Sequence, residues 1–164
     1  MEFTGQVWFT FGSPDVWVFY RFVRALAEAG GSVGLEWTPL PGSGEDVAMA
    51  TFSGLPTPTD RGLFLHAMLG KVHLDGADPT EPATVAMALD AAGLGGVVVS
   101  NTVLEETEQL AKDLGVTGVP SLFRHGPVTR IRLNPAALLG DVLARASRLL
   151  ALADDDGIWE VAKP

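Results

Sequence analysis

The sequence contains no cysteine among its 164 residues. Without a thiol, the chain forms no disulfide, offers no sulfur ligand to zinc or to an iron–sulfur cluster, and has no thiolate nucleophile. Exchange between a dithiol and a disulfide within the chain is also excluded, because that reaction needs an attacking and a resolving sulfur. The absence of cysteine therefore excludes these reactions and these metal sites.

Basic residues are scarce, since 11 Lys and Arg stand against 20 Asp and Glu, for a net charge of −9. An acidic surface repels phosphate backbones, so we expect no nucleic-acid partner. No apolar run approaches the roughly 20 residues that span a bilayer, and the N-terminus lacks the pattern of a signal peptide. We therefore expect no membrane association and a cytoplasmic location. The length and the 47% of hydrophobic residues indicate one domain with a sizeable core.

The start of the chain predicts a strand followed by a well-marked helix. Residues 6–11 are mostly β-branched and aromatic, and the run stops at Gly12, which is typical of a buried strand. Ser13 is a good N-cap, and Pro14 suits the first helical position, where its missing N–H costs nothing. Asp15 complements the positive end of the helix.

The helix continues with apolar side chains at helical spacing until Gly30 and Gly31 end it. Residues 32–40 then predict a second strand. A strand, a helix and a strand in this order form a right-handed parallel unit. The chain is therefore expected to be an α/β protein.

The middle of the chain, about residues 41–100, predicts a small helical insertion. Residues 41–58 are rich in Gly, Pro, Ser and Thr and predict a loop, although the short apolar piece at residues 47–50 fits no particular structure. Helical patterns follow at residues 59–71 and 80–92. Residues 97–99 are three valines, which fit either a short strand or a buried approach to the next helix.

The next segments predict a helix and a β-hairpin. Thr102 and Glu105 have the spacing of a capping box, an apolar stripe follows, and Gly115 marks the end of the helix. Residues 122–124 precede a turn at residues 125–127, and residues 128–133 after it alternate apolar and polar side chains, which predicts a hairpin.

A final helix is predicted from Asn134, an N-cap, and Pro135 to the acidic stop at residues 154–157. The sequence assigns no role to the acidic tail beyond it. Trp159 in that tail would either pack back on the domain or dock to another subunit.

Two short motifs flank this arrangement. The first is Phe-Thr-Phe-Gly-Ser-Pro-Asp-Val-Trp at residues 9–17, and the second is Gly-Val-Thr-Gly-Val-Pro-Ser at residues 115–121. Together they resemble the DsbA-like branch of the thioredoxin superfamily. The first motif is most similar to that of 2-hydroxychromene-2-carboxylate isomerases and kappa-class glutathione transferases, in which Ser replaces the catalytic Cys. The second is similar to the G-V-x-G-V-P-T loop of the family, whose proline is cis.

The resemblance covers essentially the whole chain and implies a single thioredoxin-like α/β domain over residues 1–164, of the DsbA type, with the helical insertion at about 41–100. It implies that Ser13 holds the place of the catalytic cysteine and that the backbone of Val119 pairs with an extended thiol peptide or a thiol cofactor such as glutathione or mycothiol. The residues expected to contact this ligand, besides Ser13, are Pro14, Trp17, Val119, Pro120 and Ser121.

The chemistry at Ser13 follows from its place at a helix N-terminus. Unpaired N–H groups and a partial positive charge favour an anion there, and a Ser hydroxyl that donates to a thiolate would lower the pKa of that thiol. An ionised Asp15 in the same turn would partly cancel this field. The alternative is that Ser13 only caps the helix, which contributes about 1 kcal/mol. Trp17 either lines a ligand pocket or belongs to the core.

Two functional hypotheses follow from this site. The first is an isomerase or transferase that depends on a low-molecular-weight thiol, with Ser13 orienting the thiolate. The second is a non-catalytic protein that uses the same groove to bind a small molecule or an extended peptide, or to assemble as a homodimer. Turnover separates the two.

The remaining polar residues offer weaker candidates. His66 and His73 are separated by Gly70, and we expect no metal site. Arg130 and Arg132 share one face of a strand by its period of two. They either bind a carboxylate or another glutathione-like anion, or solvate an edge strand, and we favour the edge strand. The net charge of +4 over residues 121–148 comes from Arg124, Arg130, Arg132, Arg145 and Arg148 against Asp141.

Overall fold

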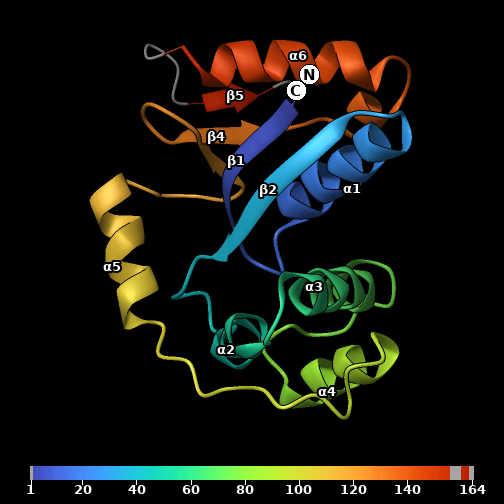
Figure 1. Cartoon of the computed structure of the whole chain (residues 1–164), viewed down its shortest axis with the longest axis vertical. Coiled ribbons are helices and arrows are strands. Elements are labelled where there is room, and N and C mark those ends of the chain that lie inside the picture. The colour runs from blue at the N-terminus through green and yellow to red at the C-terminus, as the bar shows by residue number, and fades with distance from the viewer. Residues whose placement is uncertain (1, 156–159, 163–164) are drawn as a thin grey trace. The chain divides into compact units, whose positions relative to one another are not determined.

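The computed structural model describes residues 2–155 and 160–162 (Figure 1). Its strands are β1 (Glu2–Phe9), β2 (Ser32–Pro39), β3 (Ser121–Phe123), β4 (Thr129–Arg132) and β5 (Glu160–Ala162). Its helices are α1 (Pro14–Glu28), α2 (Asp46–Gly54), α3 (Pro58–His73), α4 (Pro82–Ala91), α5 (Glu105–Leu114) and α6 (Val142–Ala153), with a 3₁₀ turn η1 (Pro135–Leu138). None of the described helices is both long and apolar enough to cross a bilayer.

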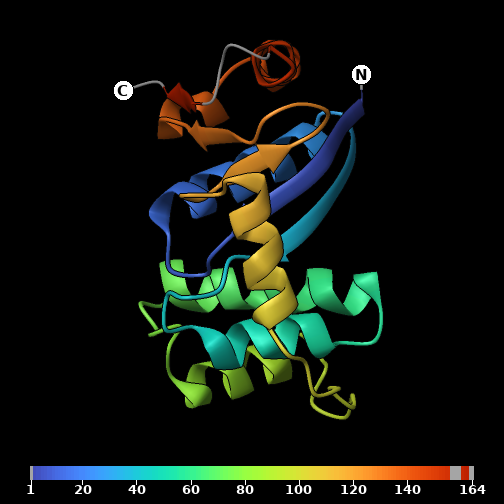
Figure 2. The ribbon, with the colours of Figure 1, turned by 90° about the vertical axis from the view of Figure 1, so that its left-hand side faces the viewer.

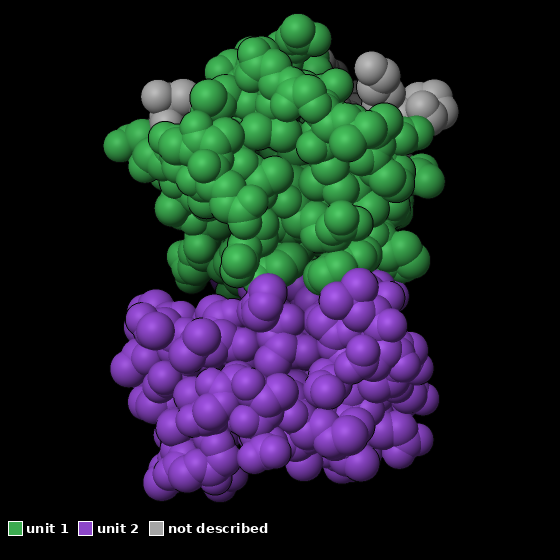
Figure 3. All heavy atoms as spheres, turned by 90° about the vertical axis from the view of Figure 1, so that its right-hand side faces the viewer, with its two compact units in different colours: residues 1–9, 13–38, 111–164 green, residues 10–12, 39–110 purple. Residues whose placement is uncertain are grey.

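The chain divides into two compact units, which are coloured differently in Figure 3. The sheet unit comprises residues 1–9, 13–38 and 111–164. The helical unit comprises residues 39–110 together with the three residues 10–12 that connect β1 to α1. The helical unit thus contains the segment predicted as an insertion.

The sheet has the strand order β2-β1-β3-β4-β5, and Figure 2 shows β1 beside β2 and the hairpin of β3 and β4. β3 pairs antiparallel with β1 and with β4, which confirms the predicted hairpin, while β4 and β5 are parallel. Because β4 lies between β3 and β5, the edge-strand interpretation of Arg130 and Arg132 is wrong.

One apolar core joins the sheet to the two helices α1 and α6. Phe3 and Val7 of β1 and Ile131 of β4 are fully or almost fully buried against them. The helical members of this cluster are Phe19, Phe22, Val23, Leu26, Val142, Ala146, Leu149, Leu150 and Ala153. The spacing of these residues along each helix is that of one buried face, as the sequence predicts.

The first strand differs from its predicted bounds of 6–11. It begins at Glu2, and the strand continues through Gly5, which adopts a φ of +144°. It ends at Phe9, because Phe11 belongs to the helical unit, where its ring makes edge contacts with Phe52 at 6.5 Å and Phe64 at 5.9 Å.

The helical unit contains one helix that the sequence does not reveal. Helix α2 occupies the segment predicted as a loop at residues 41–58, and it buries Ala48, Met49 and Phe52. Its N-cap, Glu45, makes no side-chain capping bond, so the usual start signal is absent. Helices α3 and α4 confirm the predictions at 59–71 and 80–92. Residues 97–99 lie in neither a helix nor a strand.

The C-terminal helices begin later than predicted. Thr102 does not cap α5, since its hydroxyl donates to the Ser100 carbonyl at 3.4 Å, and the helix starts at Glu105 with only Ala111 buried.

The predicted final helix is two elements. Asn134 caps the short η1, and Gly140, with a φ of +80°, separates it from α6. Asp141 then caps α6 by accepting a hydrogen bond from the Ala144 N–H at 3.0 Å. Trp159 lies outside the described residues.

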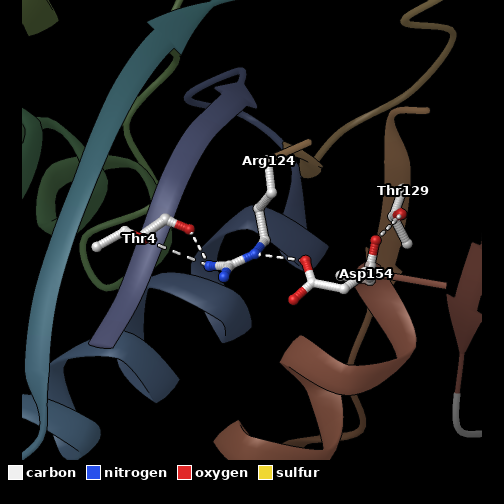
Figure 4. Close-up of polar contacts among 5 residues, drawn as sticks. Thr4, Arg124, Thr129 and Asp154 are labelled. Atoms are coloured by element: carbon white, nitrogen blue, oxygen red, sulfur yellow. Dashed lines mark hydrogen bonds and ion pairs between the residues drawn. The ribbon is translucent and has the colours of Figure 1, made fainter. Parts of the chain in front are cut away.

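Arg124, just after β3, links three elements of the sheet unit (Figure 4). Its Nε donates to Oδ1 of Asp154 at 2.7 Å, at the end of α6, and its Nη1 donates to the backbone carbonyl of Thr4 on β1. Nearby, the fully buried Thr129 on β4 donates to the carbonyl of Ala153. These contacts fix the end of α6 to the sheet.

Candidate functional site

The loop that carries the second motif lies where β1 ends. Ser121, the first residue of β3, is the antiparallel partner of Trp8, which precedes the last residue of β1. Pro120 is therefore at this end of the sheet, and its carbonyl accepts a hydrogen bond from the Ile131 N–H at 2.9 Å. The Val119–Pro120 peptide bond is cis, which confirms the expectation from the resemblance.

Ser121 stabilises the loop from within. Its hydroxyl donates to the carbonyl of Gly118 at 2.6 Å, across the cis bond, and the residue is only 2% exposed. Pro120 is buried as well, whereas Val119 is half-buried. Of the three loop residues predicted to contact a ligand, Val119 is therefore the one that is partly exposed to solvent.

Ser13 is the N-cap of α1. Its backbone is extended, with φ −74° and ψ 123°, and its Oγ accepts a hydrogen bond from the Val16 N–H at 3.3 Å. That bond uses a lone pair of the oxygen and leaves the hydroxyl hydrogen as a donor. Ser13 is half-buried, and Pro14 beside it is exposed. The residue thus caps the helix and keeps one donor that a ligand can use.

An ion pair ties the first turn of α1 to the hairpin. Asp15 lies 3.6 Å from the guanidinium Nε of Arg132 on β4. Both side chains are substantially exposed, so the stabilisation from the pair is small. Its effect on the site is electrostatic, because the positive charge offsets the negative charge that Asp15 places in the first helical turn.

Trp17 lies one turn beyond Ser13 and is half-buried. Its ring stacks on Tyr20, with centroids 6.2 Å apart and planes 17° apart, and the guanidinium carbon of Arg21 lies 5.7 Å from its centroid. Trp17 is not part of the apolar cluster between α1, α6 and the sheet. It forms an aromatic surface on the same helix as Ser13.

A row of three side chains that each carry a hydrogen-bond donor crosses the sheet next to the loop. Trp8, Ser121 and Arg130 are successive partners on β1, β3 and β4, and partners in antiparallel strands point to the same face. Trp8 is fully buried, yet its Nε1 has no hydrogen-bond partner among the described residues, and the same holds for the buried Nε of Arg130. The row is rich in donors and poor in acceptors.

Arg130 lies directly against the backbone of the loop. A Cβ atom added to Gly118 would stand 2.9 Å from both the Cζ and the Nε of Arg130. Such a separation is shorter than real side chains allow, so only glycine lets the guanidinium approach this closely. The guanidinium of Arg130 therefore lies against Gly118, the residue just before the cis Val119–Pro120 bond.

Sequence reasoning missed Glu45, which holds the two residues that precede Ser13 in the chain. One carboxylate oxygen accepts from the Phe11 N–H at 2.7 Å and the other from the Gly12 N–H at 3.1 Å. On the same segment, the Nε2 of His73 donates to the Phe11 carbonyl at 2.8 Å. A glutamate in a glycine-rich loop is ordinarily solvated, so the sequence carries no signal for this buried role.

Burial raises the pKa of Glu45 above its ordinary value, against the lowering effect of the Phe11 and Gly12 N–H donors, and the charge of Asp78 raises it further. Because the pKa of Glu45 is higher in the folded than in the unfolded chain, protonated Glu45 stabilises the fold. This stabilisation is fully present below the pKa of the unfolded chain and is lost as pH rises through the pKa of the folded chain.

We predict that the stability advantage of the wild-type chain over Glu45→Gln shrinks as pH rises from below the ordinary pKa of Glu through the raised value. Urea unfolding of both chains at a series of pH values between acidic and neutral measures it. An advantage that grows with pH would show instead that the pKa of Glu45 is lowered.

Within residues 2–155 and 160–162, no group of three or more His, Asp or Glu side chains is arranged to hold a metal ion. Burial lowers the pKa of His73, opposed by its hydrogen bond to Phe11, and His66 is exposed on α3. The two histidines considered in the sequence therefore have separate surroundings.

Comparison with solved structures identifies the fold. The crystal structure of Proteus mirabilis ScsC in a transitional conformation matches with a TM-score of 0.62 at 14% identity, over 88% of this chain and 67% of that one. No protein-family model matches the chain, and no curated protein matches its sequence. A likeness at this identity shows the fold and leaves the activity open. The chain has a thioredoxin-like fold of the DsbA type with a compact helical insertion.

Proposed function

We propose that the chain is a thiol-dependent isomerase or transferase that takes its sulfur from a bound low-molecular-weight thiol. Such a thiol would supply the nucleophile that a chain without cysteine lacks. Its ligand would lie between the start of α1 and the Val119–Pro120 loop. We further propose that the protein acts in the cytoplasm, where low-molecular-weight thiols are kept reduced.

The observation that carries the proposal is the state of Ser13. Its oxygen accepts from Val16 and leaves the hydroxyl hydrogen to donate to a thiolate. The N–H groups of the first helical turn add a positive field there, and Arg132 offsets the opposing charge of Asp15. These groups favour the thiolate over the thiol and so lower the pKa of a bound ligand.

The other residues of the site would hold and orient the ligand. The half-buried Val119 would align an extended ligand along its backbone, and Pro120 would shape the loop. Trp17, stacked on Tyr20, would cover the ligand from the side of α1. Pro14 would shape the start of α1. Ser121 would stabilise the loop and make no direct contact through its hydroxyl, which already donates to the Gly118 carbonyl.

Calorimetric titration with glutathione and with mycothiol tests the proposal. We expect at least one thiol to bind the wild-type chain at millimolar concentration or below, and Ser13→Ala to weaken that binding by about tenfold, the value of one hydrogen bond to a charged group. If neither thiol binds, the proposed function is wrong.

Two control variants separate ligand binding from helix capping. Thr57→Ala removes the equivalent cap of α3, where Thr57 Oγ1 accepts from the Asp60 N–H at 3.1 Å, and it should cost about 1 kcal/mol of stability with unchanged thiol affinity. Ser13→Asp keeps a capping oxygen but, when ionised, has no donor and adds a negative charge, so it should retain stability and lose affinity for the thiolate. Equal affinities in Ser13→Ala and wild type would assign Ser13 to capping alone.

The second candidate is a non-catalytic protein that binds a small molecule or an extended peptide in the same groove, or forms a homodimer through it. The hydrogen bond from Val16 to the Ser13 oxygen favours it, because capping alone accounts for a serine at this position. This candidate predicts binding without turnover of any electrophilic substrate in the presence of thiol. Thiol-dependent turnover that Ser13→Ala abolishes would exclude it.

A further inference from the structure

Strand β2 forms one edge of the sheet, since the strand order places it beside β1 alone (Figure 1). It is eight residues long, whereas β5 at the other edge has three. None of its backbone N–H and C=O groups bonds to a described residue outside the sheet. Natural sheets shield such edges with charges, prolines or short strands, because an open edge pairs with other chains. In β2 the one charge is Glu36 and the one proline is the last residue, Pro39, so most of this edge is unshielded.

Aromatic and basic side chains of α1 border β2. The ring of Tyr20 lies edge-on to that of Trp37 on β2, with centroids 5.9 Å apart, and its hydroxyl oxygen accepts a hydrogen bond from Arg24. The guanidinium carbon of Arg21 lies 5.7 Å from the ring centroid of Trp17, which stacks on Tyr20. Trp, Tyr and Arg are the residue types that most often dominate the binding energy of protein interfaces. We call Tyr20, Arg21, Arg24 and Trp37 the arginine stripe.

The two arginines of the stripe have no acidic partner. Arg21 and Arg24 are exposed and lie one turn apart on α1, and neither forms an ion pair within residues 2–155 and 160–162. The chain has 20 acidic residues for 11 basic ones, and Arg124 and Arg132 both pair with aspartates. The stripe is therefore a positive patch on an acidic protein, and it attracts negative charge from outside the chain.

We propose that the edge of β2 and the arginine stripe together bind an extended acidic segment of a partner protein. The segment adds to the sheet as a strand beside β2, and main-chain hydrogen bonds to the edge supply affinity. Side chains alternate between the two faces of a strand, so every second residue of the segment points to the face on which Val33, Leu35 and Trp37 pack with α1. Acidic residues at those positions meet Arg21 and Arg24. This inference is independent of the proposed thiol chemistry.

Charge favours an acidic partner over a second copy of the chain at this edge. Two copies that pair antiparallel through β2 form one continuous sheet, and their twofold axis is perpendicular to that sheet. Both α1 helices then lie on the same face, so the two arginine stripes face and repel each other. The net charge of −9 on each copy adds to this repulsion.

Calorimetric titration of the full chain with peptides as long as β2, eight residues, tests the proposal. The first peptide alternates Glu and Val, the second alternates Lys and Val, and the third is the Glu–Val peptide with a methyl group on every backbone nitrogen. We expect the Glu–Val peptide to bind about tenfold more tightly than the Lys–Val peptide, because two exposed charge contacts change from attraction to repulsion. The methylated peptide should not bind, since it has no N–H donors for the edge. Equal affinities for any two of the peptides, or no binding of the Glu–Val peptide at millimolar concentration, would overturn the proposal.

Charge reversal on the protein locates the binding surface. The double variant Arg21→Glu with Arg24→Glu changes two exposed side chains and should prefer the Lys–Val peptide. Arg148→Glu, at an exposed position on α6, should keep the wild-type preference. A wild-type preference retained by the double variant, with the circular dichroism of the wild type, would exclude the arginine stripe.

Amide hydrogen exchange tests the edge itself. The Glu–Val peptide should slow exchange at residues of β2 in the wild-type chain, because their outward N–H groups gain acceptors. Slower exchange confined to other strands would overturn the proposal. A wild-type dimer in sedimentation, with β2 amides protected before any peptide is added, would assign the edge to a second copy and would also overturn it.

Discussion

The Phe19→Ala variant should lose about 3–5 kcal/mol of unfolding free energy, the usual cost of removing a fully buried aromatic ring. Phe19 has no exposed surface, and its ring lies 6.2 Å from that of Phe3 on β1 and 5.9 Å from that of Trp37 on β2. The ring therefore joins α1 to two strands at once. Such a loss is a large part of the stability of a typical domain.

Equilibrium unfolding in urea measures this effect, with Leu139→Ala as the control. Leu139 is 70% exposed, so its truncation should change stability by no more than about 0.5 kcal/mol. A Phe19→Ala variant with stability close to that of Leu139→Ala would contradict the packing of α1 on the sheet. The position of Ser13 depends on that packing, since Ser13 caps the same helix.

The Gly5→Ala variant should be destabilised by more than about 2 kcal/mol, from two independent causes. The φ of +144° at Gly5 is unfavourable for any residue with a Cβ atom. A Cβ atom there would also lie 2.8 Å from Cδ1 of Leu122 and 2.9 Å from the carbonyl oxygen of Phe123. The second contact involves backbone, so it is relieved only by moving β1 away from β3.

Gly62→Ala is the matched control for this substitution. Gly62 lies within α3, and a Cβ atom added to it meets nothing within 4 Å. Alanine should therefore stabilise the helix by about 0.5–1 kcal/mol. Thermal unfolding of the two variants should shift in opposite directions, and a Gly5→Ala chain as stable as wild type would show that β1 does not have this backbone conformation.

Elements with local signals could be predicted from the sequence. Ser13 and Pro14 mark the start of α1, and the turn at residues 125–127 with the alternating pattern of residues 128–133 marks the hairpin. Capping and strand periodicity both depend on neighbouring residues. The cis bond at Pro120 followed from a motif. The DsbA-type fold came from two motifs in order, since neither alone specifies it.

The errors arise where long-range contacts decide the structure. The side chain of Glu45 accepts from Phe11 and Gly12, 34 and 33 residues away, instead of capping α2, so the helix has no start signal. Gly5 lies inside a strand because β3 packs against it closely. No periodicity encodes such contacts, since they depend on residues that only the folded chain brings together.

The candidate site also contains some residues that local motifs predict and others that only long-range contacts bring together. Motifs that are continuous in the chain predict Ser13 and the Val119–Pro120 loop as site residues. The row of Trp8, Ser121 and Arg130 depends on strand register, which the sequence left open. The sequence favours an edge strand for Arg130, because residues 160–162 carry no strand signal strong enough to predict β5 beside β4.

The most direct test of the proposed site is the pKa of the thiol of bound glutathione, measured by thiolate absorbance as pH is raised at a saturating protein concentration. We expect wild type to lower this pKa by about one unit or more relative to free glutathione, equivalent to about 1.4 kcal/mol in favour of the thiolate. Ser13→Ala should remove most of that shift, and Thr57→Ala should keep it. A thiol pKa in the wild-type complex equal to that of free glutathione would contradict the role assigned to Ser13.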